Sequence, residues 1–277
     1  MERATRRAPL TPGLPTRALA GLALALAIAV GARRARSLAP SGTVAATVVG
    51  TIAIAAGWGW GALLILFFAT SSALSRWRRA EKERRTATIV EKTGERDAWQ
   101  VLANGGVFTG AALAAIALPG STVAPIVAAA GAGALAAAAA DTWATEVGVL
   151  AGRSPRTIVG GRVVPPGTSG AVSWPGLAAM VAGALAIAAA ARALGVAALL
   201  PVLGGGLAGA MVDTMLGSAV QERRWCDRCD VATERRTHVC GTATRHVGGV
   251  AGLDNDWVNI ACTGAGAAVA SLIAVAR

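Results

Sequence analysis

Residues 122–150 read TVAPIVAAAGAGALAAAAADTWATEVGVL, an apolar run that ends with two acidic residues, Asp141 and Glu146. A membrane-spanning helix needs about 20 mostly apolar residues, so this stretch is long enough to cross a bilayer. Its alanines and glycines suit helices that pack backbone to backbone in lipid. Ionisable side chains within a span are costly and usually mark a functional site. The stretch therefore predicts a transmembrane helix with a functional polar end.

The composition of the whole chain also indicates a membrane protein. Of its 277 residues, 54% are hydrophobic and 15% are charged, whereas soluble domains carry about 25% charged residues. We predict an all-α, polytopic transmembrane helix bundle of about seven or eight spans, made of an N-terminal basic segment with the first helix (1–37) and a membrane catalytic domain (38–277). The other candidate spans lie at roughly 16–32, 38–56, 58–76, 98–118, 175–193, 197–221 and 256–276.

The first apolar run has two possible fates. Four arginines precede it, as they do in a cleaved signal peptide. Arg33, Arg34 and Arg36 follow it at once, and further apolar spans come next. This second pattern favours a helix that is retained in the mature protein.

The basic residues predict the orientation of the bundle. The loops 33–37, 77–97, 151–174 and 222–255, with Arg76 at their edge, contain 20 of the 26 lysines and arginines. The positive-inside rule places these loops in the cytoplasm, although the four N-terminal arginines oppose this orientation. We expect an integral protein of the cytoplasmic membrane with its active face toward the cytoplasm. Because the net charge of +11 lies in loops that flank apolar spans, we expect no nucleic-acid partner.

Polar residues of the predicted spans gather at the ends nearer the cytoplasm. Arg96, Gln100 and Asn104 follow one another at helical spacing, so they form one stripe down their span. Such groups can simply satisfy one another between helices, but several carboxylates in one layer favour a functional site. The layer contains Ser71, Ser72, Ser75, Gln100, Asn104, Asp141, Glu146, Asp213, Asp256 and Asn259.

A faint internal repeat relates two of these carboxylates. The sequences Ala-Ala-Asp-Thr at 139–142 and Met-Val-Asp-Thr at 211–214 each follow a run of small residues. Repeats of this kind place paired carboxylates at related positions in a bundle. If Asp141 and Asp213 face one cleft, they suit Mg²⁺, which takes one or two carboxylates together with substrate phosphates.

The loop at 151–174 offers groups that can bind phosphate. Residues 167–170, Gly-Thr-Ser-Gly, supply backbone N–H groups and hydroxyls close to Arg153, Arg156 and Arg162. Such a loop can cradle a phosphate, although it lacks the Gly-Lys-Ser/Thr of a Walker A motif. An ordinary polar turn is the alternative interpretation.

The loop at 222–255 carries a metal-binding pattern, Cys226-x2-Cys229-x8-His238-x-Cys240. Three thiolates and an imidazole with this spacing match a closed, structural Zn²⁺ site, a small zinc knuckle at 226–240. Zinc would fold a short loop that has no apolar core of its own. A disulfide is the alternative, which a reducing cytoplasm disfavours, and His246 is an alternative ligand.

Several motifs then occur in a fixed order along the chain. With the Cys/His loop, they resemble the integral-membrane family known as domain of unknown function 92, which includes transmembrane protein 19 and the plant phytyl-phosphate kinase. The likeness starts at about residue 38, so the first span lies outside it. The motifs are Arg96-x3-Gln-Val-x-Ala-Asn-Gly105, Asp141-Thr-x3-Glu146, Pro166-Gly-Thr-Ser-Gly-Ala-Val-Ser173, Asp213-Thr-x2-Gly217 with Gln221, and Asn255-Asp-x-Val-Asn259.

The resemblance implies a membrane-embedded phosphotransferase of the polyprenyl-phosphate kinase type. It would transfer phosphate from a nucleoside triphosphate, with CTP the expected donor, to an isoprenoid monophosphate. The expected catalytic residues are Asn104, Asp141, Glu146 and Asp213, with Asp141 and Asp213 holding Mg²⁺. The expected substrate-binding residues are Arg96, Gln100, Arg153, Arg156, Thr168, Ser169, Asp256 and Asn259. The expected partners are the lipid bilayer and the two substrates, and the sequence leaves the oligomeric state open.

Three other functions remain open at this stage. A CTP-dependent lipid cytidylyltransferase would use a similar site but release pyrophosphate. A membrane transporter would use Asp141 and Asp213 for ion or proton coupling near the midplane, although the polar groups gather at one face. A scaffold would bind a partner through its zinc loop and would not need either carboxylate.

Overall fold

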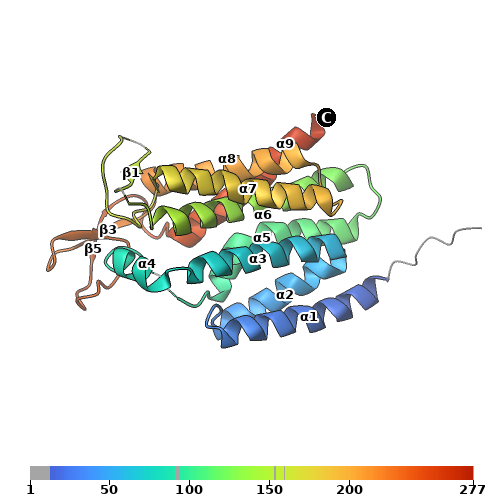
Figure 1. Cartoon of the computed structure of the whole chain (residues 1–277), viewed down its shortest axis with the longest axis horizontal. Coiled ribbons are helices and arrows are strands. Elements are labelled where there is room, and N and C mark those ends of the chain that lie inside the picture. Colours follow the sequence, from blue (N-terminus) through green and yellow to red (C-terminus); the bar gives the residue numbers. More distant parts are fainter. Residues whose placement is uncertain (1–12, 92–93, 153, 159, 277) are drawn as a thin grey trace, which may run out of the picture.

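The computed structural model describes residues 13–91, 94–152, 154–158 and 160–276. Long helices run roughly side by side, and the strands and one short helix gather at one end of the bundle (Figure 1). The long helices are α1 (Leu14–Arg34), α2 (Pro40–Ala56), α3 (Trp58–Arg76), α5 (Ala98–Ala117), α6 (Ala124–Gly148), α7 (Trp174–Ala193), α8 (Leu199–Ala219) and α9 (Asn255–Val275).

The all-α membrane bundle is confirmed. Seven of the described helices are long and apolar enough to cross a membrane, and α2 is apolar but has only 17 residues. Each long helix begins and ends within two residues of the predicted bounds. The N-terminal helix α1 packs along α2.

The helix α6 forms the centre of the bundle. It packs against α5, α7, α8 and α9, and its alanines from Ala132 to Ala140 are buried. Small residues permit this close packing. A Cβ added to Gly133 would lie 2.8 Å from the carbonyl oxygen of Gly266 on α9. A larger residue at Gly133 would therefore push α9 away from α6.

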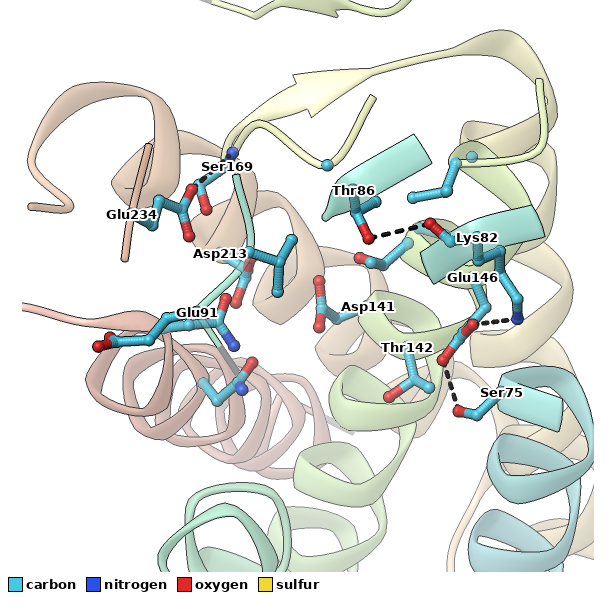
Figure 2. Close-up of a pocket in the computed structure, with 18 of the residues that line it drawn as sticks. Ser75, Lys82, Thr86, Glu91, Asp141, Thr142, Glu146, Ser169, Asp213 and Glu234 are labelled. Atoms are coloured by element: carbon cyan, nitrogen blue, oxygen red, sulfur yellow. Dashed lines mark hydrogen bonds and ion pairs between the residues drawn. The ribbon is translucent and has the colours of Figure 1, made fainter. Parts of the chain in front are cut away.

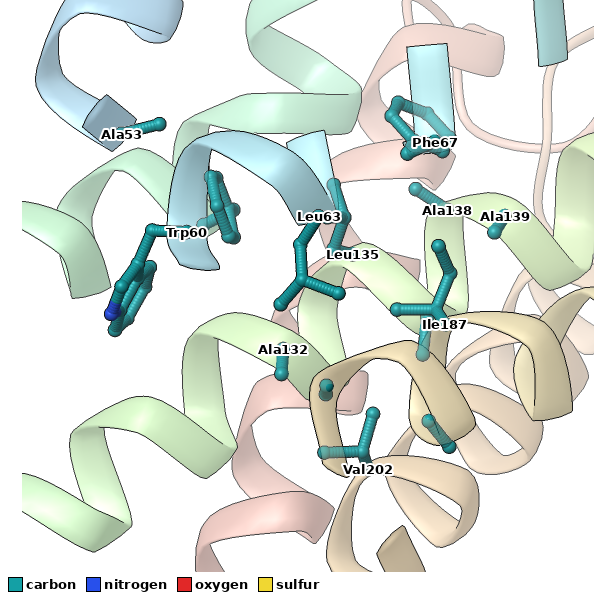
Figure 3. Close-up of a cluster of buried hydrophobic side chains, with 14 of the residues drawn as sticks. Ala53, Trp60, Leu63, Phe67, Ala132, Leu135, Ala138, Ala139, Ile187 and Val202 are labelled. Carbon is teal, nitrogen blue, oxygen red and sulfur yellow. The ribbon is translucent and has the colours of Figure 1, made fainter. Parts of the chain in front are cut away.

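Larger apolar side chains fill the space between α6 and the helices α3, α5, α7 and α8. Leu63 and Phe67 of α3 and Ile187 of α7 are buried in this cluster (Figure 3). The rings of Trp60 and Phe108 pack with their centroids 5.3 Å apart. This core fixes the position of α3. The C-terminal end of α3 contributes polar residues to the site.

We call the end of the bundle that carries the polar segments 77–97, 151–173 and 220–254 the loop end. It contains the short helix α4 (Arg79–Thr86) and the strands β1 (Arg156–Thr157), β2 (Ala171–Val172), β3 (Arg223–Cys226), β4 (Val231–Thr233) and β5 (Arg245–Gly248). The strands β1 and β2 pair in antiparallel fashion, and β3 lies between β4 and β5. The sequence had not predicted these elements.

The helix α4 has a physical basis that an apolar pattern does not reveal. Its sequence, Arg-Ala-Glu-Lys-Glu-Arg-Arg-Thr, is polar at every position but Ala80. Ion pairs between residues four positions apart support it: Arg79 with Glu83 at 2.7 Å and Arg85 with Glu81 at 2.5 Å. Lys82, between these pairs in sequence, is buried.

Candidate functional site

A cavity of about 750 Å³ lies at the loop end, and we call it the polar cavity. The ends of α3, α5, α6, α8 and α9 surround it, together with α4 and the loop before α7. Of the predicted site residues, it is lined by Arg96, Gln100, Asn104, Asp141, Glu146, Thr168, Ser169, Asp213, Asp256 and Asn259. The structure thus brings together residues that are up to 163 positions apart in sequence.

Asp141 and Asp213 face one another across the polar cavity (Figure 2). Asp141 lies on α6 and Asp213 on α8, and these helices pack against each other. A Cβ added to Gly209, one turn before Asp213, would lie 2.5 Å from both the Cys262 carbonyl oxygen and the Ala137 side chain. The lack of a side chain there lets α8 approach α6 and α9, which brings the two carboxylates together.

One oxygen of this pair lacks a hydrogen bond. Asp213 Oδ2 is buried and has no hydrogen-bond partner among the described residues. A buried carboxylate oxygen without a partner is costly, and two carboxylates that face each other repel when both are ionised. A divalent cation between them would remove both costs, and carboxylate oxygens are the ligands that Mg²⁺ prefers. The residues present therefore fit a divalent cation.

A hydrogen-bonded network lies beside the carboxylate pair. Ser75 on α3 donates to Glu146 Oε1 at 2.5 Å, and Lys82 forms an ion pair with Glu146 Oε2. Arg96 Nη2 donates to the Ser75 hydroxyl at 3.2 Å. Both carboxylate oxygens of Glu146, a predicted catalytic residue, are thus engaged, one with Ser75 and the other with Lys82. The network holds the positively charged groups of Lys82 and Arg96 at one side of the cavity.

Sequence reasoning missed Lys82 as a site residue. Its side chain is only 9% exposed, and its ammonium also donates to the carbonyl oxygen of Leu74 at 2.5 Å. It was counted among the loop charges because the segment has no apolar periodicity. A lysine between two helix-spaced ion pairs was the signal that could have identified it.

The loop at 166–173 forms a turn that borders the cavity. Gly167 and Gly170 have φ values of +90° and +70°, which favour glycine. The Thr168 hydroxyl and backbone N–H both donate to the carbonyl oxygen of Pro165. Thr168 therefore stabilises the turn, and both Thr168 and Ser169 line the cavity.

Glu234 is a second site residue that the sequence did not reveal. Its Oε1 accepts a hydrogen bond from Ser169 N at 3.2 Å, and its Oε2 accepts one from Gln221 Nε2 at 3.1 Å. Burial raises the pKa of the Glu234 carboxyl, and the hydrogen bonds from Ser169 oppose that rise. Glu234 stands beside Arg235 and Arg236 in the sequence, so no local pattern distinguishes it from a surface acid.

Two other predicted residues, Gln100 and Arg156, form hydrogen bonds within their own segments. Gln100 Oε1 accepts from Asp97 N at 3.1 Å, while Asp97 accepts from Gln100 N at 2.8 Å. This capping box closes the N-terminus of α5. Arg156 does not line the polar cavity, since its Nη1 donates to the Gly161 carbonyl at 2.8 Å within its own loop. Arg153 lies outside the described residues.

The beginnings of three helices also meet at the loop end. Helix α5 starts after Asp97, α7 after Ser173 and α9 after Asp254, and each of these side chains accepts a backbone N–H of its helix. Helix N-termini carry a partial positive charge that favours anions. Together with Arg96 and Lys82, they offset the carboxylates of the cavity.

The Cys/His loop forms a compact cluster. Ligand atoms of Cys226, Cys229, His238 and Cys240 all lie within 4.8 Å of one another, which suits a single metal ion. The Cys226 and Cys240 sulfurs are 3.6 Å apart, and His238 Nδ1 is 3.3 Å from the Cys240 sulfur. All four cysteines of the chain are free thiols rather than disulfides. His246 lies elsewhere, with Nδ1 3.5 Å from Glu222 Oε1.

The thiols of the cluster have unequal acidities. The Thr242 hydroxyl and the His238 ring lower the pKa of Cys240 to about 5, whereas hydrogen bonding to Cys240 raises the pKa of Cys229 to about 11. The thiolate is the form that binds metals. Cys240 is therefore ready to ligate at neutral pH, and a metal would deprotonate Cys229 on binding.

The Cys/His cluster is joined to the polar cavity through one strand, β4. Immediately after β4, Glu234 N donates to the carbonyl oxygen of Ile89 at 2.9 Å. Arg235 Nη1 donates to the Val90 carbonyl at 2.7 Å, and the Thr233 hydroxyl donates to Ile89. The folded Cys/His loop thus holds Glu234 against the segment that follows α4.

Comparison with known proteins agrees with this architecture. A family model described as the integral membrane protein DUF92 matches residues 23–267. Protein PGR of Arabidopsis thaliana is 30% identical over 248 residues, which cover 81% of this chain and 84% of that protein. No solved structure matches the chain. The match starts inside α1, so it extends further toward the N-terminus than the motifs had indicated. The chain belongs to the integral-membrane family DUF92.

Proposed function

We propose that this protein is a phosphotransferase that moves the terminal phosphate of a nucleoside triphosphate onto an isoprenoid monophosphate. One observation carries the proposal: Asp141 and Asp213, from distant parts of the chain, face each other in one polar cavity, and Asp213 Oδ2 has no partner among the described residues. The resemblance of the motifs to a family that includes a phytyl-phosphate kinase gives the substrate class. CTP is the expected donor.

The reaction is a direct transfer between phosphates. An oxygen of the lipid phosphate attacks the γ-phosphorus of the nucleotide. The bond from that phosphorus to the β–γ bridging oxygen breaks, and the nucleoside diphosphate leaves with the bonding electrons. Because the attacking oxygen is already ionised near neutral pH, the step requires positioning and charge neutralisation rather than a general base.

The residues of the chain divide this work between two sides of the cavity. Asp141 and Asp213 would hold Mg²⁺, which supplies charge neutralisation at the transferring phosphates. Arg96 and Lys82 place positive charge on the other side, where Glu146 and Ser75 fix their positions. Asn104, Asp256 and Asn259 line the same space and would orient the substrates. We assign Ser169 to the nucleotide phosphates and Glu234 to the positioning of Ser169.

We propose Zn²⁺ as the ion of the Cys/His cluster. Three thiols and one imidazole at these separations fit a closed tetrahedral site. Its role would be structural, since the site has four protein ligands and none of them lines the polar cavity. It would keep Glu234 in place.

We further propose that the loop end faces the cytoplasm and that the protein resides in the cytoplasmic membrane. The excess of lysine and arginine in the loops of this end supports the orientation. Nucleoside triphosphates and Mg²⁺ are cytoplasmic, so a nucleotide site must open there. Cysteine-accessibility labelling in intact cells tests the orientation independently of activity.

The function is tested with purified protein, Mg²⁺, γ-labelled CTP or ATP, and geranylgeranyl or phytyl monophosphate. The expected product is a labelled lipid diphosphate together with CDP or ADP. A CMP-containing lipid with release of pyrophosphate would identify a cytidylyltransferase instead. Failure to form either product in folded protein, with substrate flux into liposomes, would identify a transporter.

A further inference from the structure

A second cavity adjoins the polar cavity inside the bundle, and we call it the tail cavity. Its volume is about 110 Å³, and it lies between α1, α2, α3 and α5. Apolar side chains such as Ala29, Ala46, Leu64 and Phe68 form most of its wall. Four residues line both cavities: Arg96, Gln100, Asn104 and Thr142. An amphipathic molecule could therefore extend from one cavity into the other.

The packing of α1 explains why space remains there. The side of α1 that faces the bundle carries small residues, with Ala25 and Ala29 buried, whereas Leu22, Leu24 and Leu26 are exposed toward the surroundings. Alanine leaves room that leucine would fill. The helix α1 packs along α2, while α3 packs against α2, α6 and α7. The tail cavity occupies the space that α1, α3 and α5 leave beside α2.

The residues at the junction have the chemistry of a lipid phosphate site. Arg96 lies where the two cavities meet, and its guanidinium donates to Ser75, whose hydroxyl binds Glu146. The polar cavity holds the charged groups on one side of this junction. On the other side, the apolar side chains of the tail cavity can contact a hydrocarbon chain. Burial of apolar surface stabilises a bound chain in proportion to the area removed from water or headgroups.

We propose that the tail cavity binds the hydrocarbon chain of a lipid monophosphate beyond its first isoprene unit, with the phosphate at Arg96. This inference rests on the proposed function for the phosphate end and adds the route of the tail, between α1, α2, α3 and α5. The narrow volume suits a segment of a single chain, as in an isoprenoid, and not two acyl chains side by side. The remainder of the tail extends between α1 and α3 into the bilayer.

Matched substitutions on α1 test the position of the tail. Ala29 lines the tail cavity, and Ala27, two residues earlier, is exposed on the outside of the same helix. Ala29→Phe fills the cavity, whereas Ala27→Phe adds the same side chain to the lipid-facing surface. The loss of contact for two or three methylene groups corresponds to about tenfold to a hundredfold in affinity.

The readout is kcat/KM with two acceptors, geranylgeranyl monophosphate and dimethylallyl monophosphate, which differ only in the length of the chain. Ala29→Phe is expected to lower kcat/KM for the long acceptor by at least about tenfold and to leave the short one within about threefold of the wild type. Ala27→Phe is expected to change neither. Equal losses for both acceptors, or no loss for the long one, would overturn the inference. The smaller replacement Ala46→Leu, on α2, gives the same test if Ala29→Phe does not fold.

A photoreactive probe separates failure of this inference from failure of the proposed function. Geranylgeranyl monophosphate with a diazirine on its second isoprene unit is cross-linked to the wild-type protein, and the modified peptides are mapped. Cross-links to α1, α2, α3 or α5 residues of the tail cavity support the inference even if no diphosphate forms. Turnover of the acceptor with cross-links confined to other helices would contradict the inference and leave the proposed function intact.

Discussion

Lys82 of α4 forms an ion pair with Glu146 of α6, which joins a short helix of the loop end to the central span of the bundle. The two residues are 64 positions apart, and both side chains are largely buried. Glu146 also accepts the hydroxyl of Ser75 on α3. One carboxylate thus fixes the relative positions of three helices. The positions of the Lys82 and Arg96 side chains in the polar cavity depend on this arrangement, because Arg96 donates to the same serine.

This ion pair predicts a coupled loss of stability. Removing one partner leaves the other charge partly buried, so Lys82→Met or Glu146→Gln is expected to lower the free energy of unfolding by about 2 kcal/mol. Because each single change already breaks the pair, the double variant is expected to lose less than the sum of the two. Thermal unfolding in detergent micelles measures the effect.

The matched control is the exposed pair of the same helix, Arg79 with Glu83. Arg79→Met is expected to cost less than about 0.5 kcal/mol, since exposed pairs contribute little. Two results would contradict a structural role for the buried pair. One is an equal loss of unfolding free energy in Lys82→Met and Arg79→Met. The other is a loss in the double variant that equals the sum of the losses in Lys82→Met and Glu146→Gln.

The facing carboxylates predict a divalent-cation site. In the presence of a nucleoside triphosphate, the wild-type protein is expected to bind Mn²⁺, used as a paramagnetic substitute for Mg²⁺, and electron paramagnetic resonance detects the bound ion. Asp141→Asn and Asp213→Asn are each expected to weaken binding by about tenfold or more, because each removes a charged ligand. Glu81→Gln, which neutralises a carboxylate of α4 that does not line the polar cavity, serves as the control. Unchanged Mn²⁺ affinity in both asparagine variants would rule out this site.

The Cys/His cluster predicts a bound zinc ion. Metal analysis of purified protein is expected to find about one zinc per chain, as a closed four-ligand site requires. Cys226→Ser is expected to lose the metal and to lower thermal stability, because the loop has no apolar core of its own. Cys262→Ser is the control, since Cys262 is buried in α9 away from the cluster. Metal-free wild-type protein with an intact loop would refute the assignment.

The buried Glu234 predicts a pH-dependent effect on stability. Burial raises the pKa of this carboxyl in the folded protein, so the folded state binds more protons than the unfolded state between the ordinary and the raised pKa. Stability of the wild type therefore falls as pH rises through this window, from the ordinary Glu value of about 4.3 upward. Glu234→Gln lacks this ionisation.

The measurement compares melting temperatures of the wild type and Glu234→Gln from pH 4 to pH 7, in roughly half-unit steps chosen to span the window. The stability of Glu234→Gln relative to the wild type is expected to increase with pH. Other carboxyl groups titrate in the same pH range in both proteins, so the difference between the two curves carries the result. Curves that stay parallel would show that Glu234 is not buried as an acid.

The helices of the bundle were predictable because an apolar run of fixed length leaves little freedom in where a span begins and ends. The polar layer was predictable for the same reason: residues near one end of each span, such as Asn104 and Asp213, must lie at the same depth once the helices pack. Their convergence in a single cavity required the tertiary structure. Asp141 and Asp213 face each other because small residues, Gly209 among them, let α8 approach its neighbours closely.

The loop residues were much harder to place, since depth in the membrane says nothing about them. Lys82 and Glu234 lie in polar segments without periodicity, and their positions depend on how α4 and the β3–β4–β5 sheet fold back over the cavity. Arg156 is another loop residue whose contacts the sequence did not reveal. Its sequence neighbours suggested a phosphate contact, but its guanidinium turns toward its own loop.

The central claim is that the polar cavity is a phosphotransferase site built on Asp141 and Asp213. The most direct test measures transfer of the γ-phosphate of labelled CTP to geranylgeranyl monophosphate by the wild type, Asp141→Asn, Asp213→Asn and Glu81→Gln, each shown to be folded. We expect the wild type and Glu81→Gln to form the labelled diphosphate, and both asparagine variants to lose about a hundredfold or more in rate. Undiminished transfer by Asp141→Asn or Asp213→Asn would contradict the account, as would the absence of transfer by the wild type with any nucleoside triphosphate.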